Sequence, residues 1–185
     1  MTIRNFFFTI LTLSLFALAG CSGSGNSTVD CSGSTCVCID NDCICPAGEV
    51  CTSDLTNTNL TCEGDCTVTC NGSACDVDCL AGNNCTATFN GGAADLNCAE
   101  NATCTATFNG DAGDLNCVAG SDCTETCGAT ATSCSLTCNG STMCEQTCAD
   151  GSECAAVCSG GTSCAQTCAD TADCSCAGAG CPIGF

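Results

Sequence analysis

The sequence predicts an all-β fold, a flattened two-sided parallel β-solenoid of about six coils that is disulfide-braced at the turns. A unit of one cysteine, three residues and a second cysteine recurs about twelve times between Cys66 and Cys176. Two such units with their turns make a coil, and a period of about twenty residues is typical of solenoids. Only 20 of the 165 residues after Gly20 are Val, Ile, Leu, Met or Phe. That is too few for an ordinary core, so the 28 cysteines after Cys21 are expected to form a disulfide framework.

Residues 1–20 are expected to be a lipoprotein signal peptide. Arg4 gives the segment the positively charged N-terminal region of a signal peptide, and an apolar region follows from Phe6 to Leu18. Leu18-Ala19-Gly20-Cys21 resembles the lipobox of bacterial lipoproteins, which implies cleavage after Gly20, a lipid on Cys21 and export to the outer membrane or cell surface. The alternatives are an ordinary secretory peptide or a membrane anchor, although thirteen apolar residues are short for a bilayer span.

Residues 21–30 are expected to be the lipidated cysteine and a flexible tether, because the segment is rich in Ser and Gly. Residues 31–65 are expected to form a Cys-rich cap on the solenoid. Within them, two Cys-x-Cys pairs flank the Asp40-Asn41-Asp42 turn, and this arrangement predicts a small hairpin.

Residues 66–185 are expected to form the disulfide-braced solenoid repeat domain. Thr, Asp and Gly are poor helix formers and a turn arrives every ten residues, so each unit reads as a five-residue strand. In such a strand Cys66, Val68 and Cys70 point inward while Thr67 and Thr69 point outward. The expected coil starts are Cys66, Cys85, Cys104, Cys123, Cys144 and Cys164.

Asn-Gly pairs occupy the same turn in three successive coils, at residues 71–72, 90–91 and 109–110. Because Asn-Gly is favoured where the backbone needs a positive φ, we expect left-handed residues there.

The expected disulfides cross the turns. The two cysteines of one strand lie about 13 Å apart, beyond the roughly 7 Å limit between bridged Cα atoms, whereas cysteines flanking a turn can meet. The alternative is vertical pairing between neighbouring coils, which leaves Cys70 and Cys168 without partners in their column. The expected bridges are Cys70–Cys75, Cys79–Cys85, Cys98–Cys104, Cys117–Cys123, Cys127–Cys134, Cys138–Cys144, Cys148–Cys154, Cys158–Cys164, Cys168–Cys174 and Cys176–Cys181, with Cys62–Cys66 as an extension.

The pattern fails in two ways that predict local structure. Phe89 and Ala94, then Phe108 and Gly113, replace cysteines on both sides of one turn, so the two phenylalanines are expected to stack in the space of the missing bridges.

Polar residues occupy the inward middle position of three strands, at Glu125, Gln146 and Gln166. Since burying a carboxylate is costly, we expect these coils either to be hydrated or to flatten differently.

Charge excludes several classes of function. After Gly20 the chain holds all 20 acidic residues and no Lys, Arg or His. Nothing there can neutralise phosphates, so nucleic acid is excluded as a partner. Proton transfer by His and anion stabilisation by Lys or Arg are also excluded, so the chain is expected not to be an enzyme.

Two outward faces offer candidate sites. One carries threonine pairs in four successive coils, and this ladder resembles the ice-binding face of disulfide-braced insect antifreeze solenoids. Threonine is also simply a good exposed strand residue. The candidate ice-binding residues are Thr67, Thr69, Thr86, Thr88, Thr105, Thr107, Thr124 and Thr126.

The other face carries Asp76, Asp78, Asp95 and Asp114, whose stacked oxygens could hold Ca²⁺. Otherwise it is a solvated acidic face that keeps the rod soluble. Cys-x-Cys pairs also resemble those of metallothioneins, although export to an oxidising space favours disulfides. No other cofactor is expected.

The prediction for the whole chain is a non-enzymatic, lipid-anchored cell-surface protein that serves as a structural or interaction module. Its lipobox and Cys-rich repeats resemble those of Cys-rich repeat lipoproteins of myxobacteria. The membrane is its expected partner, through the lipid on Cys21, and a protein or envelope partner is left open. Ice binding and Ca²⁺ or metal binding are the alternatives.

Overall fold

The computed structural model describes residues 29–30, 37–39, 41–54, 56–160, 163–178, 181 and 183–184. The expected signal peptide, the lipidation site Cys21 and most of the expected tether lie outside the described residues. Every regular element of the described part is a β-strand, and it holds no helix long and apolar enough to cross a membrane.

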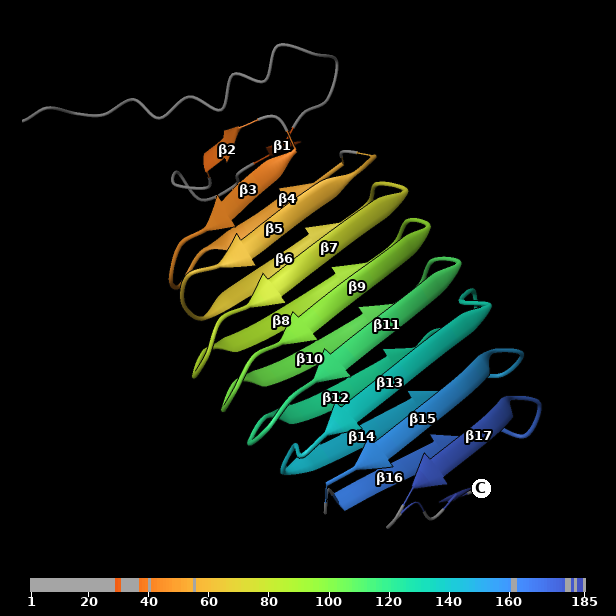
Figure 1. Ribbon diagram of the computed structural model, residues 1–185. Helices are drawn as coiled ribbons and strands as arrows, with labels where there is room; N and C mark the ends of the chain where they lie inside the picture. Colours follow the sequence, from red (N-terminus) through yellow and green to blue (C-terminus); the bar gives the residue numbers. More distant parts are fainter. Residues whose placement is uncertain are drawn as a thin grey trace, which may run out of the picture.

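The strands form two nine-stranded sheets, which lie face to face (Figure 1). Sheet A consists, in spatial order, of β1 (Val29–Asp30), β4 (Val50–Ser53), β6 (Cys66–Cys70), β8 (Asn84–Phe89), β10 (Thr103–Phe108), β12 (Asp122–Cys127), β14 (Met143–Cys148), β16 (Ser163–Cys168) and β18 (Ile183–Gly184). Sheet B consists of β17 (Asp173–Gly178), β15 (Glu153–Ser159), β13 (Ser133–Asn139), β11 (Ala112–Cys117), β9 (Ala93–Cys98), β7 (Ala74–Cys79), β5 (Thr58–Cys62), β3 (Asp42–Cys45) and β2 (Val37–Ile39).

The fold is the predicted parallel β-solenoid. Each turn carries the chain from one sheet to the other, so neighbours within a sheet are one full coil apart and run parallel. The solenoid has about seven turns. It exceeds the expected six because β3, β4 and β5, within the segment expected to be a cap, pair in parallel with the coils that follow.

Antiparallel strands cover the N-terminal end of the solenoid. The strand β2 pairs antiparallel with β3, with Val37 opposite Ile44, and this is the hairpin that the sequence predicts. The two-residue strand β1 pairs antiparallel with β4 in the other sheet. Both N-terminal sheet edges therefore end in a short strand of opposite direction, which limits further strand addition.

The core is a narrow layer between the sheets. Burial alternates along each strand, so cysteines and one middle residue point inward. The middle residues stack in register, with Val77, Leu96, Leu115 and Leu136 aligned through successive strands of sheet B. Most buried apolar residues are cysteines, so the bridges fill the volume that larger side chains occupy in an ordinary core.

The expected positive φ at the Asn-Gly turns is wrong. The glycines with positive φ in the described residues lie at other turns, and Gly72, Gly91 and Gly110 are not among them. Glycine is required at Gly91 and Gly110 because a Cβ would overlap the backbone carbonyl of the preceding coil. Asparagine is required for a side-chain ladder, in which Asn90 donates to Asn71 over 2.9 Å and Asn109 donates to Asn90 over 3.0 Å.

Candidate functional site

The outer side of sheet A carries a regular array of threonines. All eight predicted residues lie there in register, and we call them the threonine face: Thr67, Thr69, Thr86, Thr88, Thr105, Thr107, Thr124 and Thr126. The second column of the array extends beyond the four predicted coils. It begins at Thr52 and continues through Thr147 to Thr167, so seven threonines lie in successive strands.

The spacing of the array follows from the sheet. Neighbouring strands lie about 4.8 Å apart, and threonines two residues apart on one strand lie roughly 6.7 Å apart. Because the register is unbroken from β6 to β12, the threonine Cα positions repeat at these two distances in two directions. A flat surface with such a repeat can match another regularly spaced surface.

The threonine face is free of charge and of internal hydrogen bonds. Thr67 and Thr86 are exposed, and the other six residues are partly exposed. None of the eight hydroxyl groups bonds to another group of the described residues. The first column of the array ends where Glu145 and Ala165 take the threonine positions in β14 and β16.

The outer side of sheet B is acidic in its N-terminal half. Asp76, Asp95 and Asp114 are aligned in successive strands. Partial burial, then the negative charges of Asp114 and Asp76, raise the pKa of Asp95 above its usual range. In the described residues no three carboxylates bring oxygens within 4.8 Å of one another. Calcium binding at this column therefore stays a prediction.

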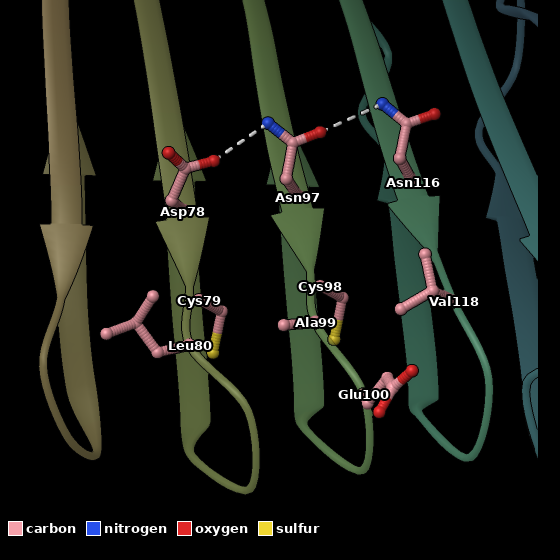
Figure 2. Close-up of a pocket in the computed structure, with 9 residues that line it drawn as sticks. All are labelled: Asp78, Cys79, Leu80, Asn97, Cys98, Ala99, Glu100, Asn116 and Val118. Carbon is pink, nitrogen blue, oxygen red and sulfur yellow. Dashed lines mark hydrogen bonds between the residues drawn. The ribbon is translucent and has the colours of Figure 1, made fainter.

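Asp78 lies in a second column on the outer side of sheet B, where the next two strands carry asparagines in place of aspartates. Asn97 donates to Asp78 over 3.0 Å, and Asn116 donates to Asn97 over 3.3 Å. Figure 2 shows this ladder together with other residues that line a groove at the ends of these strands. The groove has a volume of about 400 Å³. The groove is lined by the exposed Leu80 and Val118, so it combines apolar and amide groups.

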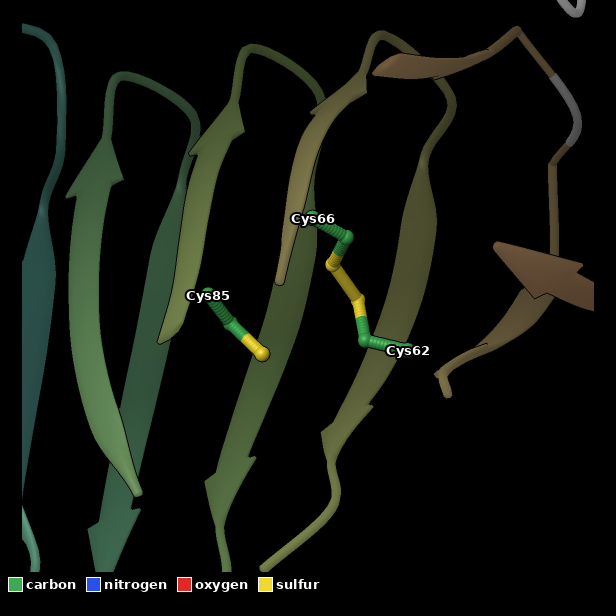
Figure 3. Close-up of side chains that lie close together, drawn as sticks. All are labelled: Cys62, Cys66 and Cys85. Carbon is green, nitrogen blue, oxygen red and sulfur yellow. A yellow bond between two sulfur atoms is a disulfide. The ribbon is translucent and has the colours of Figure 1, made fainter. Parts of the chain in front are cut away.

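The described cysteines are joined across the turns. The structure contains each of the ten expected bridges and the Cys62–Cys66 bridge, together with Cys38–Cys43 and Cys45–Cys51. Bridges in successive coils stack, so the sulfur of Cys85 lies within 4.8 Å of the sulfurs of Cys62 and Cys66 (Figure 3). As disulfides, these sulfurs are not thiolate ligands for a metal.

The two gaps in the cysteine pattern are filled as predicted. The rings of Phe89 and Phe108 stack with their centroids 4.9 Å apart and their planes 10° apart. The Phe108 ring lies beside Gly113 of the other sheet, since a Cβ at Gly113 would overlap it, and Phe89 and Ala94 are in register with these two residues. One large and one small residue thus replace two bonded cysteines.

The polar residues Glu125, Gln146 and Gln166 form a buried column within sheet A. Gln146 Nε2 donates to Glu125 Oε2 over 2.5 Å, and Gln166 Nε2 donates to Gln146 Oε1 over 2.7 Å. Both amides also donate across to sheet B, to the carbonyl groups of Ala155 and Ser175 over 3.3 Å. The strands keep their register, so the expected flattening is wrong, and an amide ladder joins the three side chains. Glu125 Oε1 and Gln166 Oε1 have no hydrogen-bond partner in the described residues, and hydration of these coils stays a prediction.

Burial raises the pKa of Glu125 to about 8, the hydrogen bond from Gln146 opposes this shift, and the charge of Asp114 adds to it. Glu125 is therefore largely protonated at neutral pH.

Comparison of the chain with protein-family models, with curated proteins and with solved structures finds no match.

Proposed function

We propose that this chain is a non-enzymatic surface protein, exported and anchored by a lipid on Cys21, whose rod presents the threonine face to a flat, uncharged partner. One observation carries the proposal. The chain has 20 acidic residues, yet the two threonine columns cross four strands without a charge. The outward side of these four strands carries one carboxylate, Asp122, which lies at the start of β12 beside the array. Solubility alone would favour charges there, because like charges keep a protein monomeric.

The rod is suited to this role because its shape does not depend on a large core. Bridges at both edges hold the two sheets together, and the parallel ladder of sheet A keeps its strands in register, so the threonine array is preorganised. A rigid surface loses little conformational entropy on binding. The second column of the array is threonine in seven successive strands, from Thr52 to Thr167, which makes the array longer than the four coils of the threonine face.

The anchoring part of the proposal is tested in the organism that produces the protein. Metabolic labelling with a fatty acid should mark the wild-type chain and leave Cys21→Ser unlabelled. After fractionation, the wild type should remain with the outer membrane, and the variant should be released or retained as unprocessed precursor. A wild-type chain that is exported without any lipid would contradict this part.

A second candidate function is ice binding, and the two-dimensional regularity of the hydroxyl array favours it. Ice is a flat, uncharged surface with a repeating lattice of hydrogen-bonding groups. An array of rigid threonines with fixed spacing can order water in the same repeat. The test is thermal hysteresis and ice-crystal shaping by the purified rod.

Matched variants separate the two faces. Thr86→Lys with Thr105→Lys introduces two bulky charges at the centre of the threonine face, and should abolish any effect on ice. Asn97→Lys with Asn116→Lys adds the same charges on sheet B and should leave the effect unchanged. If both pairs act equally, or the wild type is inactive, ice is not the partner and a macromolecular surface is left as the ligand.

A further inference from the structure

The disulfides of the C-terminal coils form a continuous chain of close sulfur atoms. The Cys158 sulfur lies within 4.8 Å of both sulfurs of the Cys176–Cys181 bridge. The Cys138 sulfur lies equally close to both sulfurs of Cys158–Cys164, and the Cys117 sulfur to both of Cys138–Cys144. Four bridges are thereby linked from the end of the rod to its middle.

Reagents in solution can reach this series of bridges only at its C-terminal end. Cys176 and Cys181 are partly exposed. The cysteines of the next three bridges are at most 5% exposed, namely Cys158, Cys164, Cys138, Cys144, Cys117 and Cys123. A reagent in solution therefore reaches the terminal bridge first.

The cysteine spacing of the last coil differs from that of the earlier coils, and this difference sets the position of the accessible bridge. Cys158 has Gly178 as its register partner, so the column of bridged cysteines lacks its usual member in β17. Cys176 instead occupies the inward middle position, in register with Ala156. From there it bonds to Cys181 beyond the strand. The terminal bridge is therefore displaced toward the interior of the rod, beside Cys158.

We propose that the Cys176–Cys181 bridge is a reaction site for small thiols, and that disulfide exchange then carries the free thiol inward from coil to coil. Exchange occurs by attack of a thiolate on a disulfide sulfur. The sulfurs need to approach from within 4.8 Å to the roughly 3.5 Å of a reactive contact, a shift of about 1 Å.

The first step consumes one external thiolate. It forms a bond to Cys181 Sγ, the Cys176–Cys181 bond breaks, and the electron pair leaves on Cys176 Sγ. The Cys176 thiolate then attacks Cys158, forming Cys158–Cys176 and releasing the Cys164 thiolate.

Two further steps repeat the same chemistry. Cys164 attacks Cys138 and releases Cys144, and Cys144 attacks Cys117 and releases Cys123. One external thiolate is exchanged for one internal thiolate, and the number of disulfide bonds is unchanged. The new bridges join neighbouring coils in place of crossing the turns.

The test uses the full chain. Thiols that are free at the start are blocked with unlabelled N-ethylmaleimide, glutathione is added briefly, and released thiols are trapped with the isotopically heavy reagent. The sample is acidified and digested with pepsin, because the chain after Gly20 offers trypsin no Lys or Arg. Mass spectrometry then locates the heavy label and the bridges.

The expected result is glutathione on Cys181, the bridge Cys158–Cys176, and heavy label on Cys164, Cys144 or Cys123. The bridges Cys138–Cys164 and Cys117–Cys144 should appear later than Cys158–Cys176. Label that stays on Cys176 or Cys181 without any inter-coil bridge overturns the proposal. Cys174 at the other edge is also partly exposed, so label on Cys168 or Cys174 is not counted. Label spread equally over the buried bridges of both edges overturns the proposal too, since this indicates general unfolding.

Two variants give a matched comparison, since each lacks one buried bridge. Cys158→Ala with Cys164→Ala removes one bridge from the series of close bridges and should hold the label on Cys176. Cys148→Ala with Cys154→Ala removes a bridge at the other edge and should leave the inward transfer intact. If the first variant does not fold, the order in which bridges appear in the wild type still decides.

Discussion

Glu125 shows how one buried residue ties stability to pH. Its side chain is fully buried at the end of the amide column, and its carboxyl group accepts a hydrogen bond from Gln146. In the unfolded chain its pKa is near 4.5, whereas burial raises the folded value to about 8. The folded chain therefore holds a proton that the unfolded chain releases between these two pH values.

The stabilising effect of this proton is complete below about pH 4.5 and is lost as pH rises toward about 8. We expect the free energy of unfolding to fall by up to about 1.4 kcal/mol per pH unit in this window. Glu125→Gln should remove the slope and raise the stability at pH 8. Thermal unfolding with the bridges intact, measured from pH 4 to pH 9, checks this.

The matched control is Glu145→Gln, which removes an exposed carboxylate from the adjacent strand. It should retain the slope of the wild type. A slope that survives in Glu125→Gln would contradict the assignment of the effect to the buried column.

Gly113 is a residue whose small size is required by its neighbour. It is buried, and a Cβ there would overlap the ring of Phe108. Gly113→Ala should lower the free energy of unfolding by about 1–3 kcal/mol, the usual cost of overpacking. Combining it with Phe108→Leu should recover part of the loss. Equal destabilisation by Gly113→Ala with either residue at 108 would show that the clash is not the cause.

At the scale of the element, the unit that repeats is a turn closed by a pair of residues. The pair is two cysteines in most coils, and the Cα atoms of Cys70 and Cys75 are 6.3 Å apart. Phe89 and Ala94 are in register with these two cysteines. The same turn geometry should therefore accept a bridge at this position.

Phe89→Cys with Ala94→Cys should form one further disulfide across the turn. Mass spectrometry without reduction should show one new bridge, between residues 89 and 94. The thermal midpoint should change little, because a short loop gains about 2–3 kcal/mol while the stack with Phe108 is lost. Two free thiols, or a bridge to another coil, would contradict the geometry of the turn.

Elements that depend on local pattern could be predicted from the sequence. The strands, their inward and outward faces and the turn-crossing pairs follow from cysteines four residues apart and from a distance limit. The first coil could not be found in this way, because β4 holds a single cysteine, Cys51, in place of a spaced pair.

The stack of Phe89 on Phe108 could be predicted, but hydrogen bonds and sulfur contacts between side chains one coil apart could not. The hydrogen bonds that the side-chain amides of Asn90 and Gln146 donate depend on the register between residues 19 to 21 positions apart. They also depend on the side-chain rotamers. The same holds for the sulfur contact between Cys158 and Cys176, since β17 departs from the spacing of earlier strands.

At the scale of the whole molecule, the rod has two halves with different cores. In the middle coils the interior holds Phe89, Leu96, Phe108 and Leu115. In the last coils the equivalent layer holds Gln146, Ala156 and Gln166 with little aliphatic surface. A solenoid is stabilised by its repeats and by their interfaces with neighbours, so stability should vary along its length.

We expect amide hydrogen exchange to be slowest in β9, β10 and β11 and to become faster from β14 toward β17. Apolar burial contributes about 25 cal/mol per Å², and the last coils have less of it, while β17 has a strand on one side only. Exchange measured by mass spectrometry at pH 7, with all bridges intact, would give this gradient. The gradient should become steeper at pH 9, because Glu125 loses its proton there and the C-terminal coils lose the support of the amide column. Uniform protection along the rod at both pH values would mean that the bridges alone set the local stability.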